Sequence, residues 1–277
     1  MLLRLVFLVA VCQAILDNDF LSFVRSRYGD KVANDLNRAD LGPNGDGSFG
    51  GGRFSRTRRP VVMIHGLRNR AGYLWRNRKV LQDNGWEGHA VLATSWGHGD
   101  TGVWEAMKEQ MKCEYVKNVR YMLLATVHYY QSEIDVLAFS MGSPITRKAI
   151  LGGHCVDTNE YIGEPITHHI NTYISVAGAN QGSTLCNFAF PGVCGMDTGL
   201  NCLSTFLKDI NAKTGYEGRN RYYIYSNGDE IIGTINGCGT KSGEIKGATE
   251  VVINGLNHDD TMFKAFDKQL ELMQKHV

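Results

Sequence analysis

The stretch DVLAFSMGS, residues 135–143, decides the fold of this chain. It belongs to an almost unbroken apolar run, residues 134–139, which predicts a buried strand. After Ser140 the sequence predicts a helix, with Pro144 in its first turn, where a residue without an N–H costs nothing. A serine at a sharp strand-to-helix turn is a candidate nucleophile. Ser140 is therefore the first candidate for a functional residue.

The usual pattern at such a turn is Gly-x-Ser-x-Gly. Ala138 stands at the first Gly position, and Gly142 keeps the second. The turn brings backbone close to backbone, and alanine adds only a methyl group, so we expect Ala138 to weaken the motif without breaking it. Ser95 in ATSWG (93–97) matches the same template. The GHGDTG that follows it does not allow a helix to start cleanly, so we expect Ser95 to be a loop residue.

Strand and helix patterns alternate along the rest of the chain. Further short apolar runs predict strands within VVMIHG (61–66), HAVLATSWG (89–97), HHINTYISVAGA (168–179), RYYIYSNGDEIIG (221–233) and GATEVVINGLNHDD (247–260). Helical spacing predicts helices over residues 18–40, 103–131, 144–151 and 261–273. This alternation predicts an α/β protein with a mostly parallel central sheet and helices on both faces.

The chain is expected to divide into three parts. Residues 1–14 resemble a secretory signal peptide, because one Arg precedes a short apolar run that ends in small residues. Residues 15–57 are expected to be a helical segment followed by a Gly-rich linker, and residues 58–277 the main domain. No later segment is apolar enough for a transmembrane helix, so we expect a secreted, extracellular protein. The 29 basic and 28 acidic residues give no electrostatic basis for binding nucleic acid.

Cysteine usage agrees with export. One of the seven cysteines, Cys12, lies in the expected signal peptide. The other six are Cys113, Cys155, Cys186, Cys194, Cys202 and Cys238. An even number in an oxidising compartment predicts up to three disulfides, and the fifteen possible pairings stay open at this stage. Metal ligation is the weaker alternative, because no pair has zinc-site spacing.

Reactive side chains follow several of the predicted strands. In a parallel sheet the loops at the carboxyl ends of the strands meet at one edge, where ligands bind. Ser140, Asp229 and His258 come in the order Ser, acid, His, which is the order in α/β-hydrolases. We expect Asp229 rather than Glu230 to be the acid, because it comes first after its strand.

Other histidines near the predicted sheet are weaker candidates. We expect His65 to be structural, because in IHG (64–66) the useful group is the backbone after the glycine. His168 and His169 precede a strand on the opposite edge and are expected to be exposed, and the role of His98 stays open.

At these residues the sequence resembles the class 2 lipases of the α/β-hydrolase superfamily. The similarity covers roughly residues 58–270 and is carried by VVMIHGL, VLAFSMGS, ISVAGAN, YSNGDEII and LNHDD. Bacterial members also have alanine at the position of Ala138. Two features depart from them: Phe139 replaces a usual histidine, and a Cys-rich insertion near 181–215 could be a wall or a lid over the cleft.

The resemblance implies a role for each motif residue. Ser140 would attack the ester carbonyl, His258 would carry the proton, and Asp229 would orient His258. The backbone N–H groups of Leu67 and Met141 would form the oxyanion hole. No cofactor and no metal are implied.

The sequence as a whole predicts a secreted serine hydrolase that cleaves carboxylic esters. Its expected substrate is a lipid or small ester, above all an acylglycerol, with transient contact to a lipid interface. Apolar residues near the site, namely Trp96, Ile231 and Ile232, are expected either to line an acyl pocket or to pack in the core. The alternatives are a short-chain carboxylesterase, a peptidase or a secreted lipid-binding protein without catalysis.

Overall fold

The computed structural model describes residues 16–42, 46–53, 58–188 and 191–276. The expected signal peptide, residues 1–14, lies outside the described residues, as does Cys12. Within the described part of the chain, no helix combines the length and the apolar character needed to cross a membrane.

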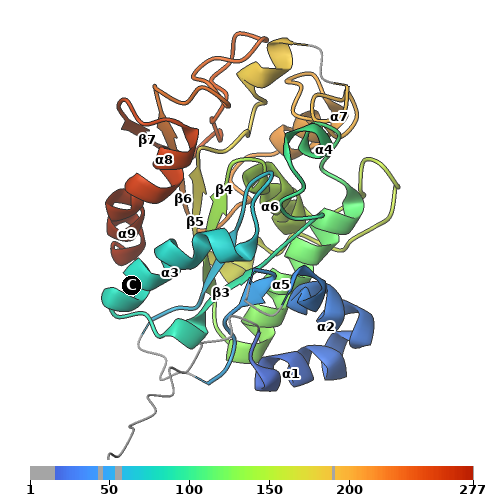
Figure 1. The fold of residues 1–277 in the computed structure, drawn as a ribbon, viewed down its shortest axis with the longest axis vertical. Coiled ribbons are helices and arrows are strands. Elements are labelled where there is room, and N and C mark those ends of the chain that lie inside the picture. The colour runs from blue at the N-terminus through green and yellow to red at the C-terminus, as the bar shows by residue number, and fades with distance from the viewer. Residues whose placement is uncertain (1–15, 43–45, 54–57, 189–190, 277) are drawn as a thin grey trace, which may run out of the picture.

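One seven-stranded sheet runs through the centre of the molecule (Figure 1). Its strands lie in the order β1-β3-β2-β4-β5-β6-β7, and only β1 is antiparallel to its neighbour. The strands are β1 Ser48–Phe49, β2 Val61–Ile64, β3 Val91–Thr94, β4 Ile134–Phe139, β5 Ile170–Val176, β6 Asn220–Ser226 and β7 Thr249–Ile253. The predicted α/β class and mostly parallel sheet are confirmed.

Both faces of the sheet are covered by helices. In β4, Val136 and Ala138 point to one apolar core, whereas Leu137 and Phe139 point to the other. The helices are α1 Asn18–Tyr28, α2 Asp30–Asn37, α3 Trp75–Asp83, α4 Val103–Ala106, α5 Cys113–Tyr130, α6 Gly142–Leu151, α7 Thr205–Asn211, α8 His258–Lys264 and α9 Phe266–Gln274. The first core packs against α5 and α6, with α1 and α2 outside α5, and the second packs against α3, α8 and α9 (Figure 1). The strands are apolar on both sides because both sides are buried.

Short 3₁₀ helices connect several of these elements. They span Ala39–Leu41, Ala71–Leu74, Gly88–Ala90, Thr167–His169 and Thr184–Asn187.

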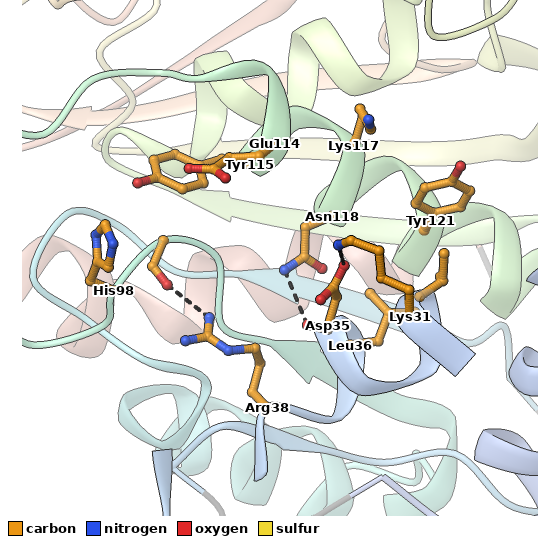
Figure 2. Close-up of a pocket in the computed structure, with 12 residues that line it drawn as sticks. Lys31, Asp35, Leu36, Arg38, His98, Glu114, Tyr115, Lys117, Asn118 and Tyr121 are labelled. Atoms are coloured by element: carbon orange, nitrogen blue, oxygen red, sulfur yellow. Dashed lines mark hydrogen bonds and ion pairs between the residues drawn. The ribbon is translucent and has the colours of Figure 1, made fainter. Parts of the chain in front are cut away.

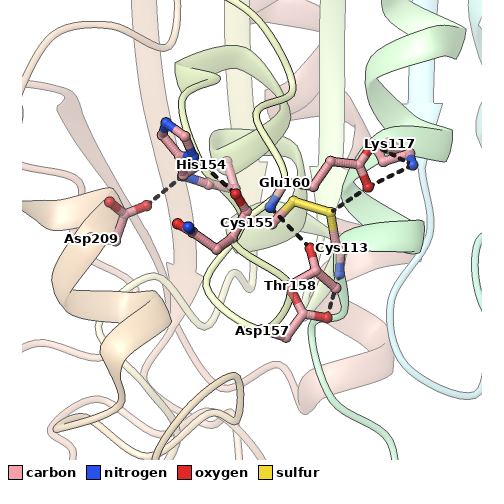
Figure 3. Close-up of a disulfide and its surroundings, with 10 residues drawn as sticks. Cys113, Lys117, His154, Cys155, Asp157, Thr158, Glu160 and Asp209 are labelled. Atoms are coloured by element: carbon pink, nitrogen blue, oxygen red, sulfur yellow. Dashed lines mark hydrogen bonds and ion pairs between the residues drawn. A yellow bond between two sulfur atoms is a disulfide. The ribbon is translucent and has the colours of Figure 1, made fainter.

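The helix expected over residues 103–131 is two helices, α4 and α5. Between them the backbone leaves the helix to bond with the Cys-rich insertion: Val193 N–H donates to Met107 O at 2.8 Å, and Met111 N–H donates to Thr198 O at 2.8 Å. The carboxylate of Asp157 then accepts the N–H of Cys113 at 3.0 Å and satisfies the start of α5 (Figure 3). Such long-range partners are invisible to helical spacing. The C-terminal helix is likewise divided at Ala265.

Part of the expected Gly-rich linker is a packed edge of the sheet. Ser48–Phe49 pair with β3, and Asp17 N–H donates to Gly50 O at 2.9 Å. Gly50 and Gly51 have φ of 93° and 83°. A Cβ at Gly50 would lie 2.4 Å from the carbonyl oxygen of Val91, and one at Gly51 would lie 2.7 Å from the Cβ of Phe20. These glycines therefore permit close packing rather than freedom of movement.

All six cysteines outside the expected signal peptide form disulfides, as predicted. The pairs are Cys113–Cys155, Cys186–Cys194 and Cys202–Cys238. The first joins the start of α5 to the loop after α6 (Figure 3). The second closes a turn within the insertion, and the third ties the insertion to the loop after β6. This disulfide content is typical of proteins in oxidising compartments.

Candidate active site

Ser140 occupies a strained turn between β4 and α6. Its φ is 50°, in the left-handed region that residues with a side chain seldom adopt. Its N–H donates to Val176 O at 3.0 Å, so β5 supports the turn. A Cβ at Gly142 would lie 2.1 Å from the carbonyl oxygen of His65, and a Cβ at Gly66 would lie 2.7 Å from the Cβ of Ser140. The glycine at the second motif position is thus required by close contact, whereas Ala138 fits within the sheet, fully buried.

Ser140, His258 and Asp229 lie in one hydrogen-bonded chain. The Oγ of Ser140 is 2.9 Å from His258 Nε2, and His258 Nδ1 is 2.8 Å from Asp229 Oδ2. Because an ionised carboxylate only accepts hydrogen bonds, Nδ1 carries the proton and Nε2 is free to accept from the serine hydroxyl. Ser140 follows β4, Asp229 follows β6, and His258 comes after the loop that follows β7. The three residues therefore meet at the carboxyl edge of the sheet.

The carboxylate of Asp229 is held on both oxygens. Its Oδ1 accepts the N–H groups of Ile231 at 3.0 Å and Ile232 at 2.8 Å, which leaves Oδ2 for His258. The side chains of Asp229 and His258 are 2% and 12% exposed, so their pairing is largely shielded from water. Glu230 is exposed and contacts the same histidine differently: its Oε2 accepts the backbone N–H of His258 at 3.0 Å. The two neighbouring acids therefore contact different parts of His258: Asp229 contacts the ring, and Glu230 contacts the backbone.

The two backbone N–H groups expected to form an oxyanion hole belong to residues on segments next to Ser140. Met141 directly precedes α6, whose N-terminus carries partial positive charge. Leu67 follows β2 and is half-buried. Among the described residues, neither the N–H of Met141 nor that of Leu67 has a hydrogen-bond partner. Both groups are therefore available to a negatively charged oxygen.

His65 is a structural residue of the neighbouring loop, in agreement with the expectation. Its Nδ1 is 2.7 Å from Gly66 O, and its Nε2 accepts the N–H of Trp96 at 3.0 Å. The indole N–H of Trp96 donates to His65 O at 2.8 Å, and the two rings stack with centroids 4.9 Å apart. Burial lowers the pKa of His65 to about 4, so the ring is neutral at physiological pH. The pair fixes the loop that carries Leu67.

The other sequence candidates lie away from this chain of hydrogen bonds. Ser95 is buried, accepts the N–H of Ala71 at 2.8 Å and donates to Asp46 O at 3.0 Å, as befits a loop residue. His98 is exposed and lies 3.1 Å from Glu109. His168 is exposed and His169 half-buried in the turn before β5.

The three residues proposed for an acyl pocket have different surroundings. Trp96 is 2% exposed and packs against His65 and Tyr115 in the core. Ile232 is 3% exposed, whereas Ile231 is 38% exposed next to Asp229. Of the three, only Ile231 offers an apolar surface to a ligand beside the site.

A buried polar network beneath the turn escaped the sequence analysis. Ser143 Oγ lies 2.8 Å from Asn180 Oδ1, 2.8 Å from Ser175 Oγ and 2.9 Å from Tyr173 OH. Asn180 also donates to Gly243 O at 3.0 Å. The network locks the first turn of α6 onto β5. In the sequence, the sign of this network is that polar residues occur within a strand that is otherwise apolar because it is buried.

Among the described residues, one group could offer three metal ligands: Cys113, Cys155 and Asp157. Its two sulfurs are joined in a disulfide (Figure 3). A cavity of about 340 Å³ lies between α2 and α5, away from Ser140 (Figure 2). Both lysines that line it are paired, with Lys31 2.5 Å from Asp35 and Lys117 2.7 Å from Glu160.

Comparison with known proteins places this geometry in context. The model of the family described as lipase (class 2) matches residues 58–271. Among curated proteins, none matches the chain.

Solved structures of lipases have the same fold. Aspergillus fumigatus lipase B has a TM-score of 0.53 and 15% identity, over 76% of this chain and 49% of that one, so the chain spans about half of its length. The mature lipase BlEst2 of Bacillus licheniformis has a TM-score of 0.55 and 14% identity, over 82% and 97%. A monoacylglycerol lipase of Paleococcus ferrophilus has a TM-score of 0.51 and 12% identity, over 79% and 97%. At these identities the likeness shows the fold, which is that of the α/β-hydrolases.

Proposed function

The chain belongs to the class 2 lipase family, and we propose that it is a secreted serine hydrolase of carboxylic esters that acts on acylglycerols through Ser140, His258 and Asp229. The observation that carries this proposal is the unbroken chain of hydrogen bonds from Ser140 Oγ through His258 to Asp229. A serine hydroxyl is a weak nucleophile by itself, and an adjacent oriented base activates it.

The first half of the reaction forms an acyl-enzyme. Ser140 Oγ attacks the ester carbonyl carbon while His258 Nε2 takes the hydroxyl proton. The carbonyl oxygen becomes an oxyanion, which the N–H groups of Leu67 and Met141 stabilise at the N-terminus of α6. The tetrahedral intermediate then expels the alcohol, which receives the proton from His258. The acyl group stays on Ser140.

The second half repeats these steps with water. His258 takes a proton from a water molecule, which attacks the acyl carbon, and the same N–H groups stabilise the second oxyanion. Collapse releases the fatty acid and returns the proton to Ser140. Asp229 stabilises the imidazolium in both halves and keeps Nδ1 protonated. The scheme uses side chains and backbone groups of the chain, the ester and one water molecule.

An exposed apolar side chain beside the proposed catalytic residues supports esters with apolar acyl groups as substrates. Ile231 presents an exposed apolar side chain two residues after Asp229. The bonds between His65 and Trp96, which hold the loop before Leu67, support a preformed oxyanion position. The disulfides and the expected signal peptide support export.

The test is labelling with a serine-reactive phosphonate followed by peptide mapping. The proposal expects one labelled residue, Ser140, and no label in the Ser140→Ala variant, with Ser95→Ala as the matched control that still labels. Label at Ser95 would overturn the nucleophile assignment. Absence of any label would favour a lipid-binding protein without catalysis.

Substrate class is tested separately on the wild-type protein. Initial rates are compared for acylglycerols of increasing acyl length, a short soluble ester and a peptide amide. The proposal expects the long acylglycerols to give the highest kcat/KM. Preference for the short ester would indicate a carboxylesterase, and cleavage of the amide a peptidase.

A further inference from the structure

Arg38 reaches from the N-terminal segment of the chain to the loop that follows β3. It directly follows α2, outside the residues that match the lipase family, and its φ is 50°. Its side chain is only 12% exposed (Figure 2). Its Nη1 donates to Ser95 O at 2.6 Å and to Gly97 O at 2.8 Å. The guanidinium therefore holds the backbone on both sides of Trp96.

The guanidinium of Arg38 is itself fixed by Asp40. Its Nε donates to Asp40 Oδ1 at 3.0 Å, and its Nη2 donates to Asp40 Oδ2 at 2.9 Å. The hydrogen bonds from Arg38 hold the pKa of the Asp40 carboxyl below its usual range, so the pair is charged on both sides. Two parallel bonds of this kind set the plane of the guanidinium. Nη1 is thereby aimed at the two backbone carbonyls.

The carbonyl of Ser95 and the N–H of Trp96 are the two ends of one planar peptide unit. Arg38 binds its oxygen end at 2.6 Å, and Nε2 of His65 accepts the hydrogen of its nitrogen end at 3.0 Å. Because both ends are bonded, the orientation of this peptide is determined. The indole N–H of Trp96 then donates to His65 O at 2.8 Å and binds the two loops together again.

His65 connects this peptide to the one that contains the N–H of Leu67. A backbone N–H only donates, so Nε2 of His65 must accept from Trp96, and Nδ1 carries the ring proton. Nδ1 donates that proton to Gly66 O at 2.7 Å. Gly66 O and Leu67 N–H are again the two ends of one peptide unit. The chain of bonds that begins at Arg38 therefore ends at a proposed oxyanion donor.

A carbonyl that accepts a hydrogen bond makes the N–H of its own peptide a stronger donor, because linked hydrogen bonds polarise one another. The positive charge of Arg38 stands at the start of this chain, and every bond in it points from donor to acceptor in the same sense. The chain should therefore both orient the N–H of Leu67 and strengthen it.

The two proposed oxyanion donors are supported in different ways. The peptide of Met141 lies at the start of α6, and its oxygen, Ser140 O, accepts the N–H of Ser143 at 3.0 Å. Leu67 lies in a tight turn, in which Asn69 N–H donates to Gly66 O at 3.2 Å. The Leu67 peptide has no helix behind it and relies on the bond from His65 in addition to this turn.

From this chain of bonds we propose that Arg38 is a positioning residue for the oxyanion site, which acts through Trp96 and His65 on the N–H of Leu67. The inference rests on the proposed function, since an oxyanion forms only if the chain hydrolyses esters. It gives the N-terminal segment a part in the reaction. The effect belongs to the transition state, where the oxyanion carries charge, and not to the binding of the uncharged ester.

The test compares the wild type with Arg38→Met, which keeps an apolar stem but removes the guanidinium. The matched control is Arg25→Met, in α1 of the same segment, where the arginine lies 3.7 Å from Asp30 at the surface. kcat and KM are measured on p-nitrophenyl butyrate, per active site titrated with a serine-reactive phosphonate, so that unfolded molecules are not counted. The second measurement is the affinity for a trifluoromethyl ketone of the same chain length, which forms an oxyanion on the nucleophile.

We expect kcat per site to fall by about tenfold in Arg38→Met, less than the roughly 10²–10³-fold loss of a whole oxyanion donor. KM should stay within about twofold, and the ketone should bind more weakly by the same factor as kcat/KM falls. Arg25→Met should match the wild type. Arg38→Lys keeps the charge but not the planar fork, so its kcat should lie between wild type and Arg38→Met. If Arg38→Met does not fold, Arg38→Lys decides by the same comparison.

Two results would overturn the inference. An unchanged kcat per site together with a lower unfolding temperature would show that Arg38 only stabilises the fold. A higher KM with unchanged ketone affinity would place its effect in the binding of substrate. A wild-type protein that neither labels nor hydrolyses the ester would instead reject the proposed function, and with it the oxyanion that Arg38 would serve. An active wild type with an unaffected Arg38→Met variant rejects this inference alone.

Discussion

The carbonyl oxygen of His65 lies directly against Gly142: a Cβ at that glycine would be only 2.1 Å away from it. The contact joins the loop that carries Leu67 to the turn that carries Ser140, although His65 and Gly142 are 77 residues apart in the sequence. It holds the loop of Leu67, one proposed oxyanion donor, against the turn that carries Ser140. Small changes at this contact should therefore affect catalysis as well as stability.

Gly142→Ala tests that contact. The added methyl must displace the backbone of one loop, so we expect a loss of about 1–3 kcal/mol in the free energy of unfolding and a fall in kcat for a soluble ester. The control is Gly243→Ala, where a Cβ would meet its nearest neighbour at an ordinary 3.6 Å. Urea unfolding and initial rates give both quantities. If the two variants behave alike, the close contact has no consequence.

The decrease in the free energy of unfolding at acidic pH should depend on His65. Burial holds the pKa of His65 at about 4, below its ordinary value of 6.5. Between these two pH values the unfolded chain binds a proton that the native protein does not. The contribution of His65 to the free energy of unfolding is therefore complete above about pH 6.5. It is lost as the pH falls towards 4, by roughly 3 kcal/mol in total.

Unfolding free energies of wild type and His65→Gln, measured from pH 4 to 8, test this dependence. We expect the difference between the two proteins to shrink steadily on acidification. The control, His168→Gln, changes an exposed histidine and should run parallel to wild type. A constant difference between wild type and His65→Gln would show that the ring does not resist protonation.

The cysteine pairing predicts that the mature protein has no free thiol. All six cysteines among the described residues are paired, in Cys113–Cys155, Cys186–Cys194 and Cys202–Cys238. Thiol titration in denaturant should therefore give no reaction before reduction and six thiols per chain after it. Peptide mapping without reduction should recover the three pairs. A reactive thiol before reduction would mean that one bond is missing.

The strands could be predicted from sequence because each is a short apolar run. β4 is the clearest example, since residues 134–139 are predicted and observed as one strand. β1 could not be found, because Ser48–Phe49 lie in a Gly-rich stretch whose partners are more than forty residues away in β3. The division of α4 from α5 was missed for the same reason, since bonds to the insertion decide it.

The candidate site was predictable to the extent that topology determines it. Parallel strands bring their carboxyl ends together, so Ser140, Asp229 and His258 could be grouped from chain order alone. Their catalytic roles stay predictions. The buried pair Arg147–Glu217 could not be foreseen, because charged residues are expected at the surface. Likewise, apolar type alone did not distinguish the buried Trp96 from the exposed Ile231.

The two adjacent acids after β6 give the sharpest test of the mechanism. Both touch His258, Asp229 at the ring nitrogen Nδ1 and Glu230 at the backbone N–H. Asp229→Asn keeps the size of the side chain but replaces one oxygen by an NH₂ group. The oxygen must stay at the Oδ1 position, because Ile231 and Ile232 both donate N–H groups there. The NH₂ group is thereby directed at His258 Nδ1.

An amide donor at that position reverses the tautomer of His258. Nδ1 must then accept, so the proton moves to Nε2, which can no longer take the proton of Ser140. We expect kcat on a soluble ester to fall by up to roughly 10⁴-fold in Asp229→Asn. Glu230→Gln retains an oxygen that can accept the N–H of His258, and the expected loss is on the order of threefold. Both proteins should fold and be exported. If Glu230→Gln is instead the variant that loses most of its kcat, Glu230 is the acid, and the assignment of Ser140 and His258 still holds.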